Sequence, residues 1–147
     1  MSIAYRIDKE IGLTLVRWDG TVTATEFLAQ IRSLTSDPNW PPPRRRHIAD
    51  TRNARLDSSM DQATLKQAAH IYAEHRDKIA NMRIAIIATD TFKQAVAYEQ
   101  VLLQYGATTV VFNNIDPAVT WLGLAPDTVQ SAFQQLPPLA PPPNRAR

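Results

Sequence analysis

HIADTRNARLDSSMDQATL, residues 47–65, is the stretch around which the rest of the chain is organised. Its first part belongs to a short strand, predicted over residues 46–50, that ends in Asp50. A polar loop carrying Arg52 and Arg55 is expected next. Asp57-Ser58-Ser59 then supplies the residue types that commonly cap the start of a helix. The stretch therefore predicts a strand–loop–helix corner, and the function depends on whether this corner is a working surface or only a turn.

The rest of the chain predicts strands and helices that alternate around this corner. Apolar residues at every second position, or an unbroken apolar run, indicate strands, and apolar residues three or four apart indicate helices. The predicted strands are residues 3–8, 13–18, 46–50, 82–89 and 108–112. The predicted helices are residues 23–36, 60–80, 91–106 and 116–123, with Asp116 as the N-cap of the last, and a further helical turn or two within 127–136.

This order, β-β-α-β-α-β-α-β-α, predicts one α/β domain. We expect a mixed sheet of about five strands and four or five helices. The first two strands should form an N-terminal hairpin that ends at Asp19-Gly20. The later strands are expected to be parallel and joined by right-handed crossovers. The expected division is a domain over residues 1–125, a C-terminal helical extension over 126–136 and a Pro-rich disordered tail over 137–147.

Composition and charge exclude several classes of protein. The chain has 147 residues, 44% of them apolar and 20% charged, as expected for a globular domain. It has no cysteine, which excludes disulfides and thiol catalysis. No apolar run approaches the roughly 20 residues of a membrane span, and residues 1–10 lack the apolar segment of a signal peptide, so we expect a soluble, cytoplasmic protein without membrane insertion.

The distribution of basic residues gives little reason to expect a nucleic-acid partner. Two of the 16 basic residues, Arg145 and Arg147, lie in the tail, so the remainder balances its 14 acidic residues. Arg44-Arg45-Arg46 beside Trp40 is the one basic cluster. Three arginines that lead into an edge strand are more often a solubilising loop than a binding site for nucleic acid or anionic lipid.

No catalytic or cofactor motif stands out. The four glycines are isolated, which excludes a Gly-rich phosphate loop, and no GxSxG, HExxH or catalytic carboxylate pair occurs. His70 and Glu74 have the i, i+4 spacing that can hold a metal, but no third ligand is indicated. We therefore expect no enzyme activity, no cofactor and no metal.

The succession of predicted elements resembles the STAS domain, the fold of bacterial anti-sigma factor antagonists of the SpoIIAA type. The resemblance covers roughly residues 3–124 and is closer to the uncharacterised SpoIIAA-like branch. Its features are the hairpin, the strand ending at Asp50, the helix start at Asp57-Ser58-Ser59, the IIATD segment at residues 86–90 and the closing VVFNNIDPAVTWLG at residues 110–123.

The resemblance implies a non-catalytic module for protein–protein regulation. In signalling members the helix start reads D-S-S-G, and a partner kinase phosphorylates a serine there. By similarity Ser58, with Ser59 beside it, is the candidate phosphoacceptor, although Met60 stands where glycine is expected. The candidate partner surface consists of Arg52, Arg55, Asp57, Met60 and Asp61.

The chemistry of the corner supports two interpretations. A phosphate on Ser58 would add nearly two negative charges at a helix N-terminus, where the amides and the helix dipole favour anions. Arg52 and Arg55 lie close enough in sequence to pair with it, whereas Asp57 and Asp61 would repel it. The simpler interpretation is that Asp57-Ser58-Ser59 only caps the helix.

Binding of a small hydrophobic ligand or lipid is the alternative function. Its basis is a group of aromatic residues that are expected to pack between helices and that together can line a pocket. They are Tyr72, Tyr98, Tyr105 and Trp121. An exposed edge strand and several apolar helices also make a homodimer compatible with the sequence.

Overall fold

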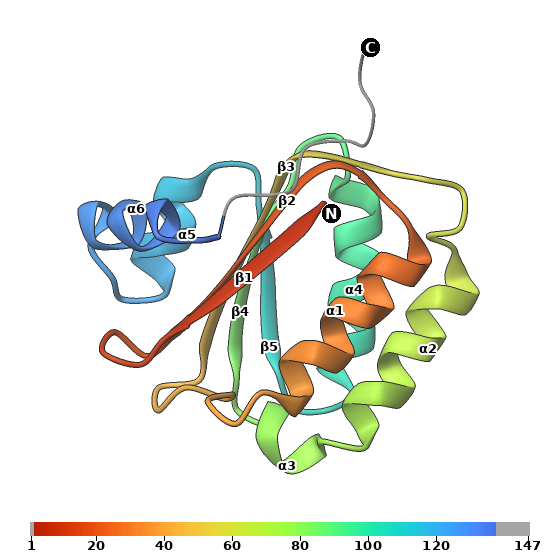
Figure 1. The fold of residues 1–147 in the computed structure, drawn as a ribbon, viewed down its shortest axis with the longest axis horizontal. Coiled ribbons are helices and arrows are strands. Elements are labelled where there is room, and N and C mark those ends of the chain that lie inside the picture. Colours follow the sequence, from red (N-terminus) through yellow and green to blue (C-terminus); the bar gives the residue numbers. More distant parts are fainter. Residues whose placement is uncertain (1, 138–147) are drawn as a thin grey trace.

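The computed structural model describes residues 2–137, which form one α/β domain around a five-stranded mixed sheet (Figure 1). The strands are β1 (Ile3–Asp8), β2 (Leu13–Val22), β3 (Arg46–Leu56), β4 (Arg83–Ile87) and β5 (Thr108–Phe112). The helices are α1 (Ala24–Ser36), α2 (Gln62–Ala73), α3 (Arg76–Ile79), α4 (Phe92–Leu103), α5 (Ile115–Trp121) and α6 (Pro126–Gln134).

The strands lie in the sheet in the order of the sequence, β1-β2-β3-β4-β5. β1 and β2 form the predicted antiparallel hairpin, and all later neighbours are parallel. Because each right-handed crossover steps in the same direction, α1, α2 and α4 cover one face of the sheet, and α5 and α6 cover the other (Figure 1). Within residues 2–137 the strand order never reverses, so this part of the chain forms no switch-point crevice at the carboxyl ends of the strands.

Each face of the sheet has its own hydrophobic core. The larger core lies under α1, α2 and α4, and the smaller one lies under α5 and α6. The central strand β4 shows the division, because Ile84 and Ile86 enter the larger core while Ala85 and Ile87 enter the smaller one. The unbroken apolar run of this strand therefore predicted its burial on both faces correctly.

Two strands are longer than the sequence predicts. β2 continues past Asp19-Gly20 to Val22, and β3 continues past Asp50 to Leu56. Residues 19–22 pair with residues 53–56 beyond the end of β4, and the register shifts at a bulge where β3 has two residues opposite Trp18. The prediction of a loop around Arg52 and Arg55 is therefore wrong, because these residues belong to β3, which is paired with β2.

The predicted helix over residues 60–80 is two helices. α2 begins only at Gln62, and its N-cap is Asp61, whose carboxylate accepts a hydrogen bond from the Thr64 amide at 3.1 Å. His75 has a non-helical backbone and separates α2 from α3. Because this break divides one predicted helix into two and α6 is a helix of its own, residues 2–137 contain six helices, where four or five were predicted.

The start of α5 also differs from the prediction. Its N-cap is Asn114, which accepts a hydrogen bond from the Asp116 amide at 3.1 Å, so Asp116 lies inside the helix. Within the part of the chain that the structure describes, no helix combines the length and apolarity needed to cross a membrane. The predicted disordered tail, apart from Pro137, lies outside the described residues.

Candidate functional site

A cavity of about 340 Å³ lies between the sheet and the helices α1, α2 and α4. Its deep walls are apolar and buried, with Val16, Leu34, Ile84 and Leu102 as examples from both the strands and the helices. The volume falls in the usual range of ligand pockets, roughly 300–1,000 Å³. It is about twice that of the ~150 Å³ engineered cavity that binds benzene.

Aromatic rings form much of the cavity wall. The ring of Phe27 packs edge-on against Trp18 and against Tyr98, with 5.5 Å between ring centroids in both pairs. Burial raises the pKa of Tyr72 and of Tyr98, and the nearby Tyr72 raises the pKa of Tyr98 further. Both hydroxyl groups therefore stay protonated at neutral pH, and both side chains are part of a largely apolar wall.

The sequence identified only half of the aromatic group correctly. Tyr72 and Tyr98 line the cavity, but Tyr105 packs against Arg76, whose guanidinium lies 5.1 Å from the ring centroid. Trp121 lies on the opposite face of the sheet, against Phe112. Trp18, Phe27 and Trp40, which also line the cavity, were missed because no local pattern distinguishes a cavity wall from a filled core.

The mouth of the cavity opens at the first turns of α2 and α4. The exposed residues of the described lining are Asp61, Gln62, Lys93 and Gln94, and all four belong to these two helix starts. In Figure 1 the N-terminal ends of α1, α2 and α4 lie at the same end of the domain, as parallel crossovers require. Half-buried Met60 lies among the lining residues next to this rim, so the predicted corner borders the mouth.

The interior of the cavity is electrically neutral. Asp61 and Lys93, the charged residues that line it, are both at the mouth. His47 lines the wall, and burial lowers its pKa to about 4, so the imidazole is uncharged at neutral pH. Thr51 donates a hydrogen bond to the Ile87 carbonyl at 2.8 Å, which satisfies another polar group of the wall.

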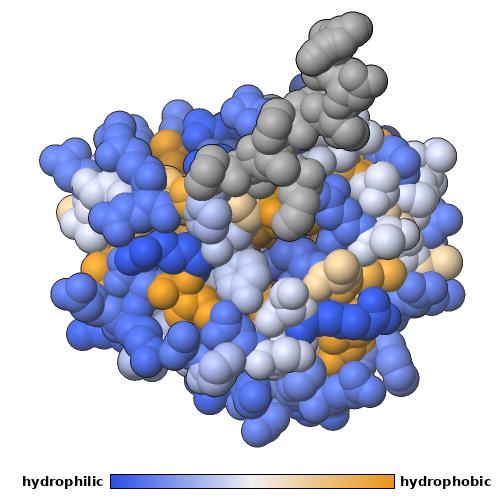
Figure 2. Space-filling model, viewed as in Figure 1, coloured by the Kyte–Doolittle hydropathy of each residue, from blue (hydrophilic) through white to orange (hydrophobic). Residues whose placement is uncertain are grey.

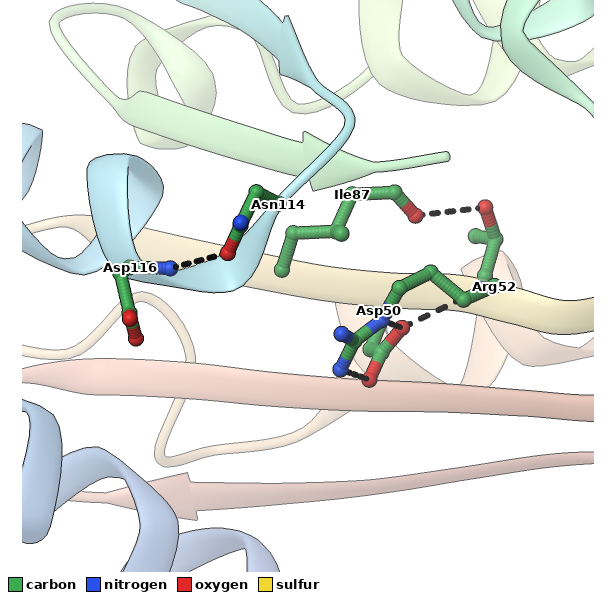
Figure 3. A network of polar contacts seen from close by, with 6 residues as sticks. Asp50, Arg52, Ile87, Asn114 and Asp116 are labelled. Carbon is green, nitrogen blue, oxygen red and sulfur yellow. Dashed lines mark hydrogen bonds and ion pairs between the residues drawn. The ribbon is translucent and has the colours of Figure 1, made fainter. Parts of the chain in front are cut away.

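Arg52 is bound to Asp50 (Figure 3). Its Nε and one terminal nitrogen contact the two carboxylate oxygens at 2.9 Å and 2.8 Å, and its backbone amide donates to the same carboxylate at 3.1 Å. The hydrogen bond to Asp50 raises the pKa of the guanidinium, and Asp116 adds to the effect. Arg52 therefore already has a carboxylate partner and is not held ready for a phosphate on Ser58.

The residues Asp57-Ser58-Ser59 form a turn before α2. The Asp57 carboxylate accepts hydrogen bonds from the hydroxyl and from the backbone amide of Ser59, the latter at 2.7 Å, and these bonds lower the pKa of Asp57. The predicted helix cap is therefore wrong for these residues, since Asp61 caps α2. The side chains of Ser58 and Arg55 are exposed.

Arg45 and Arg46 are structural residues. Arg45 donates from one nitrogen to the carbonyls of Asp77, Lys78 and Ala80 at the end of α3, at 3.0, 2.9 and 2.8 Å. Buried Arg46 donates to carbonyls of the β1–β2 turn and to that of Leu122, at the end of α5. Arg44 is the exposed residue of the three, so the prediction of a solubilising loop is wrong for Arg45 and Arg46.

Comparisons with known proteins give no relative from which to transfer a role. No known protein family and no curated protein sequence matches the chain. Within residues 2–137, no group of three or more His, Asp or Glu side chains is placed to hold a metal ion. The cavity is the feature of the described structure with the clearest binding chemistry.

Proposed function

We propose that this domain is a non-catalytic binding module that holds a small hydrophobic ligand in the cavity under α1, α2 and α4. The observation that carries the proposal is the cavity itself, with its apolar and aromatic walls, neutral interior and polar mouth. An apolar molecule gains by leaving water for such a site. The polar rim at the mouth gives a contact for any part of the ligand that stays hydrated.

The size of the cavity sets the expected affinity. An empty apolar cavity costs about 24 cal/mol per Å³, which for this volume is on the order of 8 kcal/mol as an upper bound. Water entering at the mouth lowers this figure. A free energy of binding of about 8 kcal/mol corresponds to a Kd near 1 μM. Scaling the size of benzene by the ratio of the two cavity volumes gives a ligand of about a dozen non-hydrogen atoms. We expect its Kd to be micromolar or weaker.

Cavity-filling substitution tests the proposal. Ala97 on α4 lines the cavity, so Ala97→Phe should fill part of it, whereas Ala63 on α2 is exposed and does not line it. The neutral fluorescent probe 1-naphthylamine, which matches the expected ligand size, should bind wild type and Ala63→Phe with equal affinity, and Ala97→Phe should bind it at least tenfold more weakly. Equal binding by all three proteins, or no binding by wild type, would contradict the proposal.

A STAS-like assignment is part of the same proposal. The hairpin and the alternation of helices and strands after it, which are part of the resemblance, are present in the fold. Two other shared features are not, because β3 continues past Asp50 and α2 begins at Gln62 rather than at Asp57-Ser58-Ser59. Under this assignment the domain acts by binding. The homodimer stays a prediction, and light scattering after size-exclusion chromatography measures it directly.

Protein–protein regulation of the anti-sigma-antagonist type is the second candidate function. The observation that favours it is the exposed side chain of Ser58 in the turn next to the cavity mouth. Against it, Arg52 is paired with Asp50, and Asp57 and Asp61 flank the serine. Intact-mass spectrometry of protein from its native host, with Ser58→Ala as the control, tests for phosphorylation. A protein partner that wild type retains and Ser58→Asp loses would support this function.

A further inference from the structure

Among residues 2–137, five buried side-chain polar atoms have no hydrogen-bond partner, and two of them are N–H donors of residues that line the cavity. They are Nε2 of Gln30, from α1, and Nε1 of Trp40, from the segment between α1 and β3. The Trp40 side chain is only 3% exposed, and its indole N–H can donate but cannot accept. Buried polar groups in native proteins nearly always have a partner, so two unpaired donors beside one cavity indicate a missing acceptor.

A purely hydrocarbon ligand would leave both donors unpaired. The Gln30 amide turns easily about its last side-chain torsion, so its N–H groups can be directed into the cavity. The Trp40 ring is held by packing in the larger core, and a ligand must bring its acceptor to the indole. A bound acceptor therefore adds hydrogen bonds to the apolar contacts that the walls already provide.

The charge of the interior limits which acceptor can enter. Of the residues that the structure describes, Lys93 is the only cation that lines the cavity, and it is at the mouth, so no described arginine or lysine lies on the buried side. A carboxylate or phosphate in the interior would be desolvated without a counter-charge. A carbonyl, ether or ester oxygen accepts hydrogen bonds without this loss.

We infer that the ligand is an uncharged, mainly apolar molecule with a carbonyl-type oxygen, and that Gln30 and Trp40 donate hydrogen bonds to it. The inference rests on the proposed function, because it names the chemistry of the molecule that the cavity holds. It assigns the two donors as specificity-determining residues. They select an oxygenated ligand over a hydrocarbon of the same shape.

Two probes of equal size separate this inference from simple apolar binding. 2-Acetylnaphthalene carries a ketone, and 2-isopropylnaphthalene has the same number of non-hydrogen atoms without an acceptor. Titration calorimetry gives the ratio of their dissociation constants for wild type and for the double variant Gln30→Leu/Trp40→Phe. We expect the preference for the ketone to fall at least fivefold in the double variant, about one hydrogen bond. The hydrocarbon should bind both proteins within about threefold.

Controls keep the outcomes distinct. Gln67→Leu, at an exposed position of α2 that does not line the cavity, should leave the ratio unchanged. If the double variant does not fold, Gln30→Leu and Trp40→Phe are measured singly, and at least one should lower the ketone preference threefold. An unchanged ratio with both probes bound would overturn the inference and leave the proposed function intact. Failure of both probes to bind wild type would overturn the proposed function as well.

Discussion

Ser59 Oγ accepts a hydrogen bond from the backbone amide of Ala24 at 2.8 Å, and so joins the turn before α2 to the first residue of α1. The amides in the first turn of a helix have no partner within the helix. Ser59 therefore satisfies an amide of a helix 35 residues away in sequence. The turn before α2 is therefore partly a structural junction between the end of β3 and the start of α1. Ser59 makes this junction, whereas the side chain of Ser58 is exposed.

Substitution of the two serines should affect stability differently. Ser59→Ala removes the contact to Ala24 and to Asp57, and we expect it to lower the free energy of unfolding by about 1 kcal/mol, as for loss of a helix cap. Ser58→Ala, at the exposed neighbour, should change it by less than about 0.5 kcal/mol. Urea denaturation measures both. Equal effects of the two substitutions would show that the junction does not contribute.

Asp61→Ala tests the corrected start of α2. The Asp61 carboxylate caps the helix through the Thr64 amide, so its loss should destabilise the protein by about 1 kcal/mol. Helix α2 packs on α1 and α4, and its fraying should also accelerate amide hydrogen exchange in the first turn. Wild-type stability of Asp61→Ala would mean that another residue caps the helix.

The buried Arg46 should be far more important for stability than Arg44. Its guanidinium donates to carbonyls of Ile11, Gly12 and Leu122, and no salt bridge of the described residues includes it. Arg46→Met should lower the free energy of unfolding by about 2–4 kcal/mol, because it leaves these carbonyls unpaired. Arg44→Met, at an exposed position, is the matched control and should have an effect below about 0.5 kcal/mol.

His47 predicts a loss of stability in mild acid. Burial lowers its pKa from 6.5 to about 4, so the unfolded chain binds a proton between these values and the folded protein does not. The contribution of neutral His47 is fully present above pH 6.5 and is lost as the pH falls toward 4. The free energy of unfolding should fall by on the order of 2–3 kcal/mol over this pH range. This is somewhat less than the full pKa shift of His47 implies, because the imidazole borders a cavity that opens to water.

The measurement compares the free energy of unfolding at pH 7 and pH 4.5 for wild type, His47→Gln and His70→Gln. His47→Gln should flatten the dependence on pH. His70, which is exposed on α2, is the control, and His70→Gln should keep the wild-type dependence. If His47→Gln has the same profile as wild type, His47 titrates normally in the folded protein.

Local pattern in the sequence determined which elements form and which sides of them are buried. The alternation in residues 3–8 and 13–18 predicted the hairpin, and the apolar run before Asp90 predicted a strand covered on both faces. These features depend on the period of side chains along a single element, 2 for a strand and 3.6 for a helix, which the sequence displays directly. The α/β class and the parallel crossovers follow from the order of those elements.

Tertiary structure alone decided the extension of β3, the roles of the arginines and the existence of the cavity. Residues 53–56 alternate polar and apolar side chains, and they extend β3 because residues 19–22 pair with them. Arg46 is buried because the turn at Gly12 and the end of α5 present carbonyls to it. The cavity under α1, α2 and α4 is a volume that side chains from seven elements leave unfilled, and its size depends on the distances between those elements. The periodicity of apolar residues shows which face of a helix or strand is buried. It does not show how closely the neighbouring element packs against that face, and this distance decides whether a cavity remains.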